Sequence, residues 1–205
     1  MRRFIVFSLF VFALVAVLSS SAYARADDSA GKFVKNLSDR AISTLTDSKL
    51  GKKERDSRFR VLLNEHFDVP AIGRFALGRY WRSADATKQQ EYLKLFEEVI
   101  VQTYADRFGQ YSGQTLKVSS TDKSDGFYTV HSQMLQPSEG EPIFIDWRLK
   151  SAGGSYKITD VIVEGVSMSV TQRSEYSAII ERAGGDLNAL LKVMRNKANS
   201  AKSDS

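Results

Sequence analysis

The stretch from Thr115 to Glu164, TLKVSSTDKSDGFYTVHSQMLQPSEGEPIFIDWRLKSAGGSYKITDVIVE, decides the fold of this 205-residue chain. Hydrophobic and polar residues alternate along it with a period of two, which is typical of strands that bury one face. Short polar turns interrupt the alternation and favour antiparallel pairing. The pattern therefore predicts an antiparallel sheet of four strands over residues 115–120, 127–135, 143–150 and 156–164.

Segments on both sides of this sheet repeat their hydrophobic residues every three to four positions, the pattern of amphipathic helices. We expect helices over residues 29–46, around 59–67, and over 70–77, 86–108, 171–183 and 186–194. Helices that precede and follow an antiparallel meander predict an α+β fold. The N- and C-terminal helices should pack on one face of a curved antiparallel sheet.

The first 24 residues have the organisation of a secretory signal peptide. Two arginines precede an apolar run from Phe4 to Leu18, and small residues suited to cleavage after Ala24 or Ala26 follow it. An uncleaved anchor is the alternative, but an apolar run of this length is too short for a hydrocarbon core about 30 Å thick. We expect an exported protein from which residues 1–24 are removed.

The remaining chain shows no linker and no internal repeat. Residues 27–195 are expected to form a single domain, and residues 196–205 a polar, flexible tail. Removing residues 1–24 takes away two arginines and lowers the formal net charge from +5 to +3. Export and this small charge argue against nucleic acid as a partner. The absence of cysteine excludes thiol chemistry, disulfides and thiolate metal sites.

Catalytic motifs are weak in this sequence. The two histidines, His66 and His131, have no further ligands at metal-binding spacing, so we expect no metal and no cofactor. Gly165-Val166-Ser167-Met168-Ser169 partly resembles a nucleophile elbow, but it lacks the last glycine, and both histidines precede the serine. A serine hydrolase using Ser167 is retained as an alternative of another class, and our main expectation is that the chain is not an enzyme.

Arginines and aromatic residues alternate between residues 74 and 82. The pattern fits a packed aromatic cluster with a solvated arginine rim, or a surface that docks on anionic lipid or an acidic partner. The residues are Arg74, Phe75, Arg79, Tyr80, Trp81 and Arg82.

Several segments together resemble the MlaC (toluene-tolerance) family over residues 33–194. They are LGRYWRSA at 77–84, KQQ at 88–90, YSGQT at 111–115 and DVIVEGVSM at 160–168. The sequence departs from the family at Ala86, where relatives often have proline. The resemblance implies a periplasmic, soluble carrier with an NTF2-like layout that holds acyl chains in an apolar cavity between helices and sheet.

The resemblance also implies partners. Such carriers move phospholipid between an outer-membrane lipoprotein/porin complex and an inner-membrane ABC transporter with an MCE-domain protein, which maintains outer-membrane lipid asymmetry. A related branch is associated with hopanoid lipids, so a hopanoid is kept as an alternative ligand. We expect a monomer with a bound membrane lipid as its ligand.

Predicted inward faces and the resemblance together select the expected lipid-binding residues. Plain core packing is the alternative role for each of them, because periodicity does not distinguish a cavity wall from a solid core. The residues are Phe67, Ile72, Phe75, Phe96, Ile100 and Tyr104 from the helices, and Ile143, Ile145, Trp147, Val161, Val163, Val166 and Met168 from the sheet and its exit turn.

Overall fold

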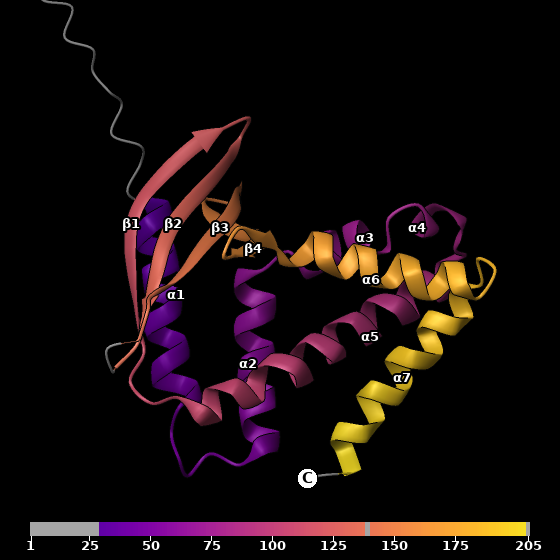
Figure 1. Cartoon of the computed structure of the whole chain (residues 1–205), viewed down its shortest axis with the longest axis horizontal. Coiled ribbons are helices and arrows are strands. Elements are labelled where there is room, and N and C mark those ends of the chain that lie inside the picture. Colours follow the sequence, from indigo (N-terminus) through magenta and orange to yellow (C-terminus); the bar gives the residue numbers. More distant parts are fainter. Residues whose placement is uncertain (1–28, 138–139, 204–205) are drawn as a thin grey trace, which may run out of the picture.

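A computed structural model describes residues 29–137 and 140–203, so the expected signal peptide and its cleavage sites lie outside the described residues. The order of elements confirms the predicted α+β fold (Figure 1). Five helices and a 3-10 helix precede the sheet: α1 Ser29–Leu45, α2 Lys52–His66, α3 Val69–Leu77, α4 Tyr80–Ser83, α5 Ala86–Tyr104 and η1 Ala105–Gln110. Helices α6 Met168–Arg182 and α7 Leu187–Ser203 follow it.

The sheet is an antiparallel meander with the order β1-β2-β3-β4-β5. The four predicted strands are present as β1 Thr115–Ser124, β2 Phe127–Leu135, β3 Ile143–Ala152 and β4 Ser155–Val163. The β1–β2 connection has φ of 51° at Asp125 and 80° at Gly126, the left-handed pair that a tight two-residue hairpin turn requires.

Strand β5, Val166–Ser167, is an element that the sequence did not predict. A second two-residue turn at Glu164 (φ 50°) and Gly165 (φ 76°) folds it back on β4. Glutamate rarely adopts this left-handed conformation. Its side chain is held here because Phe144 donates its backbone N–H to Glu164 Oε1 at 2.6 Å.

Two predicted helix ends are wrong. Helix α5 ends at Tyr104 and continues only as the 3-10 helix η1, where an α-helix to residue 108 was expected. Helix α7 continues to Ser203, well past the expected end at Met194, so most of the expected flexible tail is helical. Tertiary packing explains the extension, because Ala198 is 4% exposed and its carbonyl accepts from Gln102 Nε2 of α5 at 2.8 Å.

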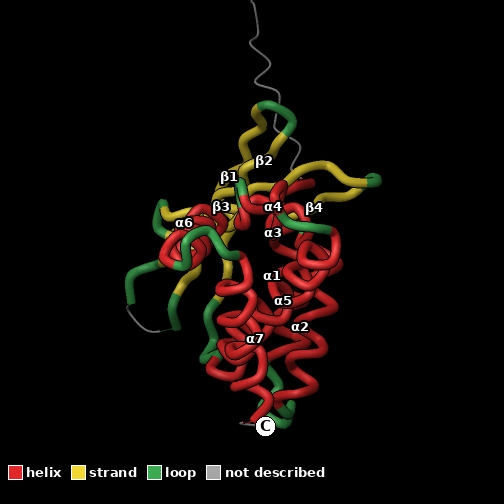
Figure 2. Tube along the Cα trace, turned by 90° about the vertical axis from the view of Figure 1, so that its right-hand side faces the viewer, coloured by secondary structure: helices red, strands yellow, loops and turns green. Residues whose placement is uncertain are grey.

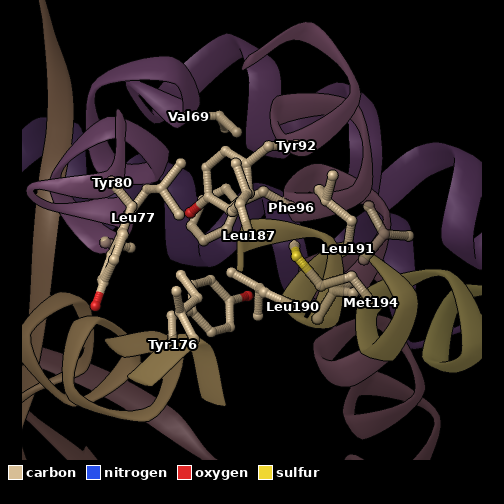
Figure 3. Packing of buried hydrophobic residues seen from close by; sticks show 14 of the residues in the cluster. Val69, Leu77, Tyr80, Tyr92, Phe96, Tyr176, Leu187, Leu190, Leu191 and Met194 are labelled. Atoms are coloured by element: carbon tan, nitrogen blue, oxygen red, sulfur yellow. The ribbon is translucent and has the colours of Figure 1, made fainter. Parts of the chain in front are cut away.

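The interior consists of two hydrophobic clusters. The sheet cluster lies between α1 and the sheet and includes Val34, Leu116, Tyr128, Val130, Ile145, Leu149 and Ile158. The helical cluster lies among α3, α5, α6 and α7 and includes Val69, Leu77, Tyr92, Phe96, Tyr176, Leu190, Leu191 and Met194 (Figure 3). Figure 2 shows the same division, with the strands above and α2, α5 and α7 below.

The junction between α2 and α3 fastens the helices to the sheet. Phe67 packs against both clusters and pairs with Ile158 as an isolated parallel bridge. The Asp68 N–H donates to the Ile158 carbonyl at 2.9 Å, and the Asp68 carboxylate pairs with Lys150 of β3. Asp68 also caps α3 by accepting from Ala71 N at 3.1 Å. The two clusters therefore meet at Phe67.

The outer face of the sheet carries a histidine held between two carboxylates. His131 Nδ1 lies 2.8 Å from Asp146 Oδ1, and Nε2 lies 3.0 Å from Asp122 Oδ2. Burial lowers the pKa of His131, but hydrogen bonds to Asp146 and Asp122 outweigh this and raise the pKa above its usual value. Protonation of His131 therefore joins β1, β2 and β3 more firmly.

We expect His131→Gln to lower the free energy of unfolding at acidic pH more than at alkaline pH. A raised folded-state pKa contributes stability below the unfolded value, about 6.5, and the contribution is lost as pH rises through the folded value. The difference between about pH 5 and about pH 8 should be on the order of 0.5 kcal/mol, because the pairs are partly exposed. Urea titrations at both values measure it, and equal losses at the two values would contradict the assignment.

Candidate lipid-binding site

The inner face of the sheet presents the predicted apolar side chains in register. Trp147 on β3 lies opposite Val161 on β4, and Ile145 lies opposite Val163. Directly opposed residues of an antiparallel pair point to the same face of the sheet. The register therefore brings these side chains together with Ile143, two residues before Ile145 on the same strand.

Burial differs along this face. Leu149 and Ile158 are 0% exposed within the sheet cluster. Further along the same two strands lie partly buried side chains that we call the apolar row: Ile143, Trp147, Val161 and Val163. Their partial exposure leaves apolar surface available for contact with a ligand.

Three predicted helical residues have the same intermediate burial. Phe67, Ile72 and Ile100 are partly buried and pack on the edge of the helical cluster. Phe67 also contacts the sheet cluster. The helical edge and the sheet face thus share Phe67, whereas Ile72 and Ile100 are partly buried against the helical cluster only.

Two other predicted residues are packed in the core. Phe96 is 2% exposed, and its ring centroid lies 5.8 Å from that of Tyr92 and 6.3 Å from that of Tyr176. Ile145 is 6% exposed in the sheet cluster. Both therefore have the plain packing role that was the alternative.

Three predicted residues lie at the surface. Val166 is 53% exposed, Phe75 is 42% exposed and Tyr104 is 37% exposed. The guanidinium of Arg173 lies 5.2 Å from the ring centroid of Phe75. The guanidinium of Arg107 lies 5.2 Å from the ring centroid of Tyr104. These side chains do not join the apolar row, and Met168 lies half-buried at the first position of α6.

Ser132 fixes the tryptophan of the apolar row and was missed in the sequence. It is 2% exposed, and its hydroxyl donates to the Ile145 carbonyl at 2.7 Å. Trp147 Nε1 in turn donates to Ser132 Oγ at 3.0 Å. The sequence feature that could have identified Ser132 is a polar residue at an inward-facing position of a strand. The bond satisfies the indole N–H and leaves the apolar surface of the ring for packing.

The helical cluster contains a polar atom without a partner. The Tyr176 hydroxyl is buried and has no hydrogen-bond partner among the described residues, whereas Tyr92 donates to the Gly73 carbonyl at 2.9 Å. Burial raises the pKa of Tyr176, so its phenol stays protonated. An unmet donor in an apolar interior would gain a hydrogen bond from a ligand oxygen or a water molecule.

A separate surface pocket of about 240 Å³ lies between α2, α3 and α5. Its lining residues are Asn64, Val69, Pro70, Leu93, Lys94 and Glu97. None of them is a predicted wall residue, and the volume is below the range of roughly 300–1,000 Å³ typical of small-molecule sites. This pocket is therefore not part of the candidate site.

Ser167 has a structural role at the start of α6. Its hydroxyl donates to Asp160 Oδ2 at 2.6 Å and accepts from Val170 N at 3.1 Å. His131 is bound to carboxylates on the outer sheet face, and His66 lies edge-on to Phe33 with ring centroids 5.4 Å apart. Across residues 29–137 and 140–203, no histidine hydrogen-bonds to Ser167. The Ser167 hydroxyl instead caps α6 through its bond from Val170 N.

We expect Ser167→Ala to lower the free energy of unfolding by about 1–2 kcal/mol, because it removes both the helix cap and a partner of a buried carboxylate. Chemical denaturation measures this change. Hydrolysis of a chromogenic ester should be the same for the variant and the wild type. Ester turnover that disappears in Ser167→Ala would restore the hydrolase alternative.

The fold and the site define a class of protein: an α+β binding protein whose candidate site is built from apolar side chains rather than catalytic groups. A family model described as "MlaC protein" matches residues 35–196. The chain belongs to the MlaC family. This membership, and not a missing motif, supports the expectation that the chain is not an enzyme.

One relative covers nearly the whole chain, and another covers about half of it. The chain is 23% identical over 201 residues to the "Intermembrane phospholipid transport system binding protein MlaC" of Haemophilus influenzae, covering 94% of this chain and 92% of that protein. It is 24% identical over 110 residues to the "Toluene tolerance protein ttg2D" of Pseudomonas putida, covering 54% of this chain and 51% of that protein.

A solved structure has the same fold. It is the phospholipid-binding protein from Ralstonia solanacearum in complex with a phospholipid, with a TM-score of 0.72 and 21% identity. The match covers 86% of this chain and 99% of that one. None of the helices in the described part of this chain is long and apolar enough to cross a membrane.

Proposed function

We propose that this chain is a periplasmic phospholipid carrier that shields acyl chains at the boundary between its sheet and its helical cluster. The observation that carries the proposal is the apolar row, whose partly buried side chains extend the sheet cluster along β3 and β4 beyond the buried Leu149 and Ile158. The Haemophilus relative, an intermembrane phospholipid transport system binding protein, supports the same interpretation, as does the phospholipid bound in the Ralstonia structure.

The energetics of such a site are favourable. A sixteen-carbon chain gains roughly 12 kcal/mol when it leaves water for an apolar environment, at about 0.8 kcal/mol per CH₂. Opening the boundary between the clusters to admit the chain subtracts from this gain. Affinity is therefore readily obtained, and release is the harder step.

Release requires partners that bind one form of the carrier better than the other. We propose an outer-membrane lipoprotein/porin complex and an inner-membrane ABC transporter with an MCE-domain protein as these partners, and lipid asymmetry of the outer membrane as the outcome. A phospholipid is the proposed cargo. Hopanoid is the competing cargo that the experiment below distinguishes.

The test is native mass spectrometry of protein isolated from the periplasm, followed by identification of the extracted lipid. We expect folded protein carrying phospholipid, with an N-terminus generated by cleavage after Ala24 or Ala26. Folded protein that is reproducibly free of lipid would contradict the carrier function. A hopanoid in the extract would keep the carrier function and replace the proposed cargo.

A further inference from the structure

We propose that a surface formed by α3, α4 and the first turns of α6 docks on an anionic phospholipid bilayer. The surface concerned, which we call the arginine patch, consists of Arg74, Phe75, Trp81, Val170 and Arg173, together with the exposed Arg82 that follows Trp81 in the sequence. Its α4 part lies at the other side of the molecule from α1 and β1, whereas Val170 and Arg173 lie in the first turns of α6, which follows directly on β5 (Figure 1). The patch includes no residue of the apolar row.

Aromatic rings hold two of these arginines. The Arg74 guanidinium lies 5.3 Å from the Trp81 ring centroid, and that of Arg173 lies 5.2 Å from the ring centroid of Phe75. Arg173 also crosses the turn after α3, where a Cβ on Gly78 would lie 3.0 Å from its Nε. A guanidinium stacked on a ring keeps its N–H edge available, and that edge matches phosphate oxygens.

The charges of the patch are not neutralised within the described residues. Arg79, next to the patch, pairs with Glu181 at 2.8 Å. In contrast, no carboxylate in residues 29–137 or 140–203 lies within ion-pair distance of Arg74, Arg82 or Arg173. A negatively charged surface would supply the missing counter-charge, at about 1 kcal/mol per basic residue.

Exposed apolar side chains lie among these charges. Phe75 is 42% exposed beneath Arg173, and Val170, one turn from Arg173 on α6, is 51% exposed. Cationic residues with apolar and aromatic neighbours are typical of surfaces that rest in the headgroup region of a bilayer. Three unpaired arginines and a small apolar area give weak, reversible binding, which suits a protein that must leave the membrane again.

The test is cosedimentation with vesicles of phosphatidylcholine alone and with vesicles of equimolar phosphatidylcholine and phosphatidylglycerol. We expect binding only to the anionic vesicles, weakened by salt. Arg173→Glu should weaken it roughly thirtyfold, because each basic residue contributes about 1 kcal/mol and the substitution reverses the charge. Arg173→Gln should show a smaller loss. Thermal unfolding checks that both variants are folded.

Arg107→Glu is the matched control. Arg107 also lies over an exposed ring, that of Tyr104, but it follows α5 at the end of the molecule near α1. Arg107→Glu should bind anionic vesicles as the wild type does. No binding of wild type to these vesicles, or an equal loss in Arg107→Glu, would overturn the proposal. Binding of the patch to an acidic polypeptide but not to vesicles would also overturn it.

Vesicle binding and lipid loading are measured separately. An empty but folded protein that still binds anionic vesicles through Arg173 would contradict the carrier function alone. A lipid-loaded protein that does not bind anionic vesicles would contradict the docking proposal alone.

Discussion

Asp160→Ala should lower the free energy of unfolding by about 3 kcal/mol, because it leaves buried donors without their acceptor. Asp160 is 8% exposed, and its Oδ1 accepts from the N–H of Val161 at 2.9 Å and of Ser169 at 3.1 Å. Its Oδ2 accepts from the Ser167 hydroxyl at 2.6 Å. One carboxylate thus joins β4, β5 and the first turn of α6.

Asp160→Asn is the control for this experiment. The amide oxygen can still accept from both backbone N–H groups, so the loss should be about 1 kcal/mol, set by the bond to Ser167 alone. Urea denaturation of both variants gives the comparison. If Asp160→Ala lost no more stability than Asp160→Asn, the carboxylate would not be holding this junction together.

Ile143→Glu should remove most of the bound lipid while Phe144→Glu leaves it unchanged. The two residues are neighbours on β3 but point to opposite faces, with Ile143 in the apolar row and Phe144 53% exposed on the other face. A carboxylate among acyl chains loses its hydration, which costs several kcal/mol and more than tenfold in affinity. The measurement is phospholipid per protein after purification.

Val161→Glu should repeat the effect from the neighbouring strand, because Val161 lies opposite Trp147. Ile145→Glu would not be a useful variant, since Ile145 is 6% exposed in the sheet cluster and a charge there would unfold the protein. Equal lipid contents in Ile143→Glu and Phe144→Glu would place the ligand away from the sheet face.

The sheet was predictable because period two along β1 to β4 reflects one buried face and one wet face. Strand β5 was not predictable, because it depends on a left-handed conformation at Glu164, and glutamate in a sequence does not indicate such a conformation. The end of α7 was missed for another reason. Residues such as Ala198 look like part of a polar tail until α5 is placed beside them.

The sequence predicted which face of the sheet carries the candidate site, but not how exposed each side chain on that face is. Periodicity selected Ile145 and Trp147 equally, yet one is buried in the core and the other is partly exposed beside Val161. Helical periodicity likewise pointed Phe75 and Tyr104 inward, although both rings lie at the surface beneath arginines. The degree of exposure depends on which elements pack against each side chain, which only the assembled fold determines.

Photo-cross-linking tests the central claim most directly. Delipidated protein is loaded with a phosphatidylcholine analogue that carries a diazirine near the end of one acyl chain, irradiated, and mapped by peptide mass spectrometry. We predict adducts on the apolar row and on Phe67, at the boundary between the sheet and the helical cluster. Adducts confined to exposed residues such as Phe144 or Val170, or no adducts in folded protein, would contradict the account.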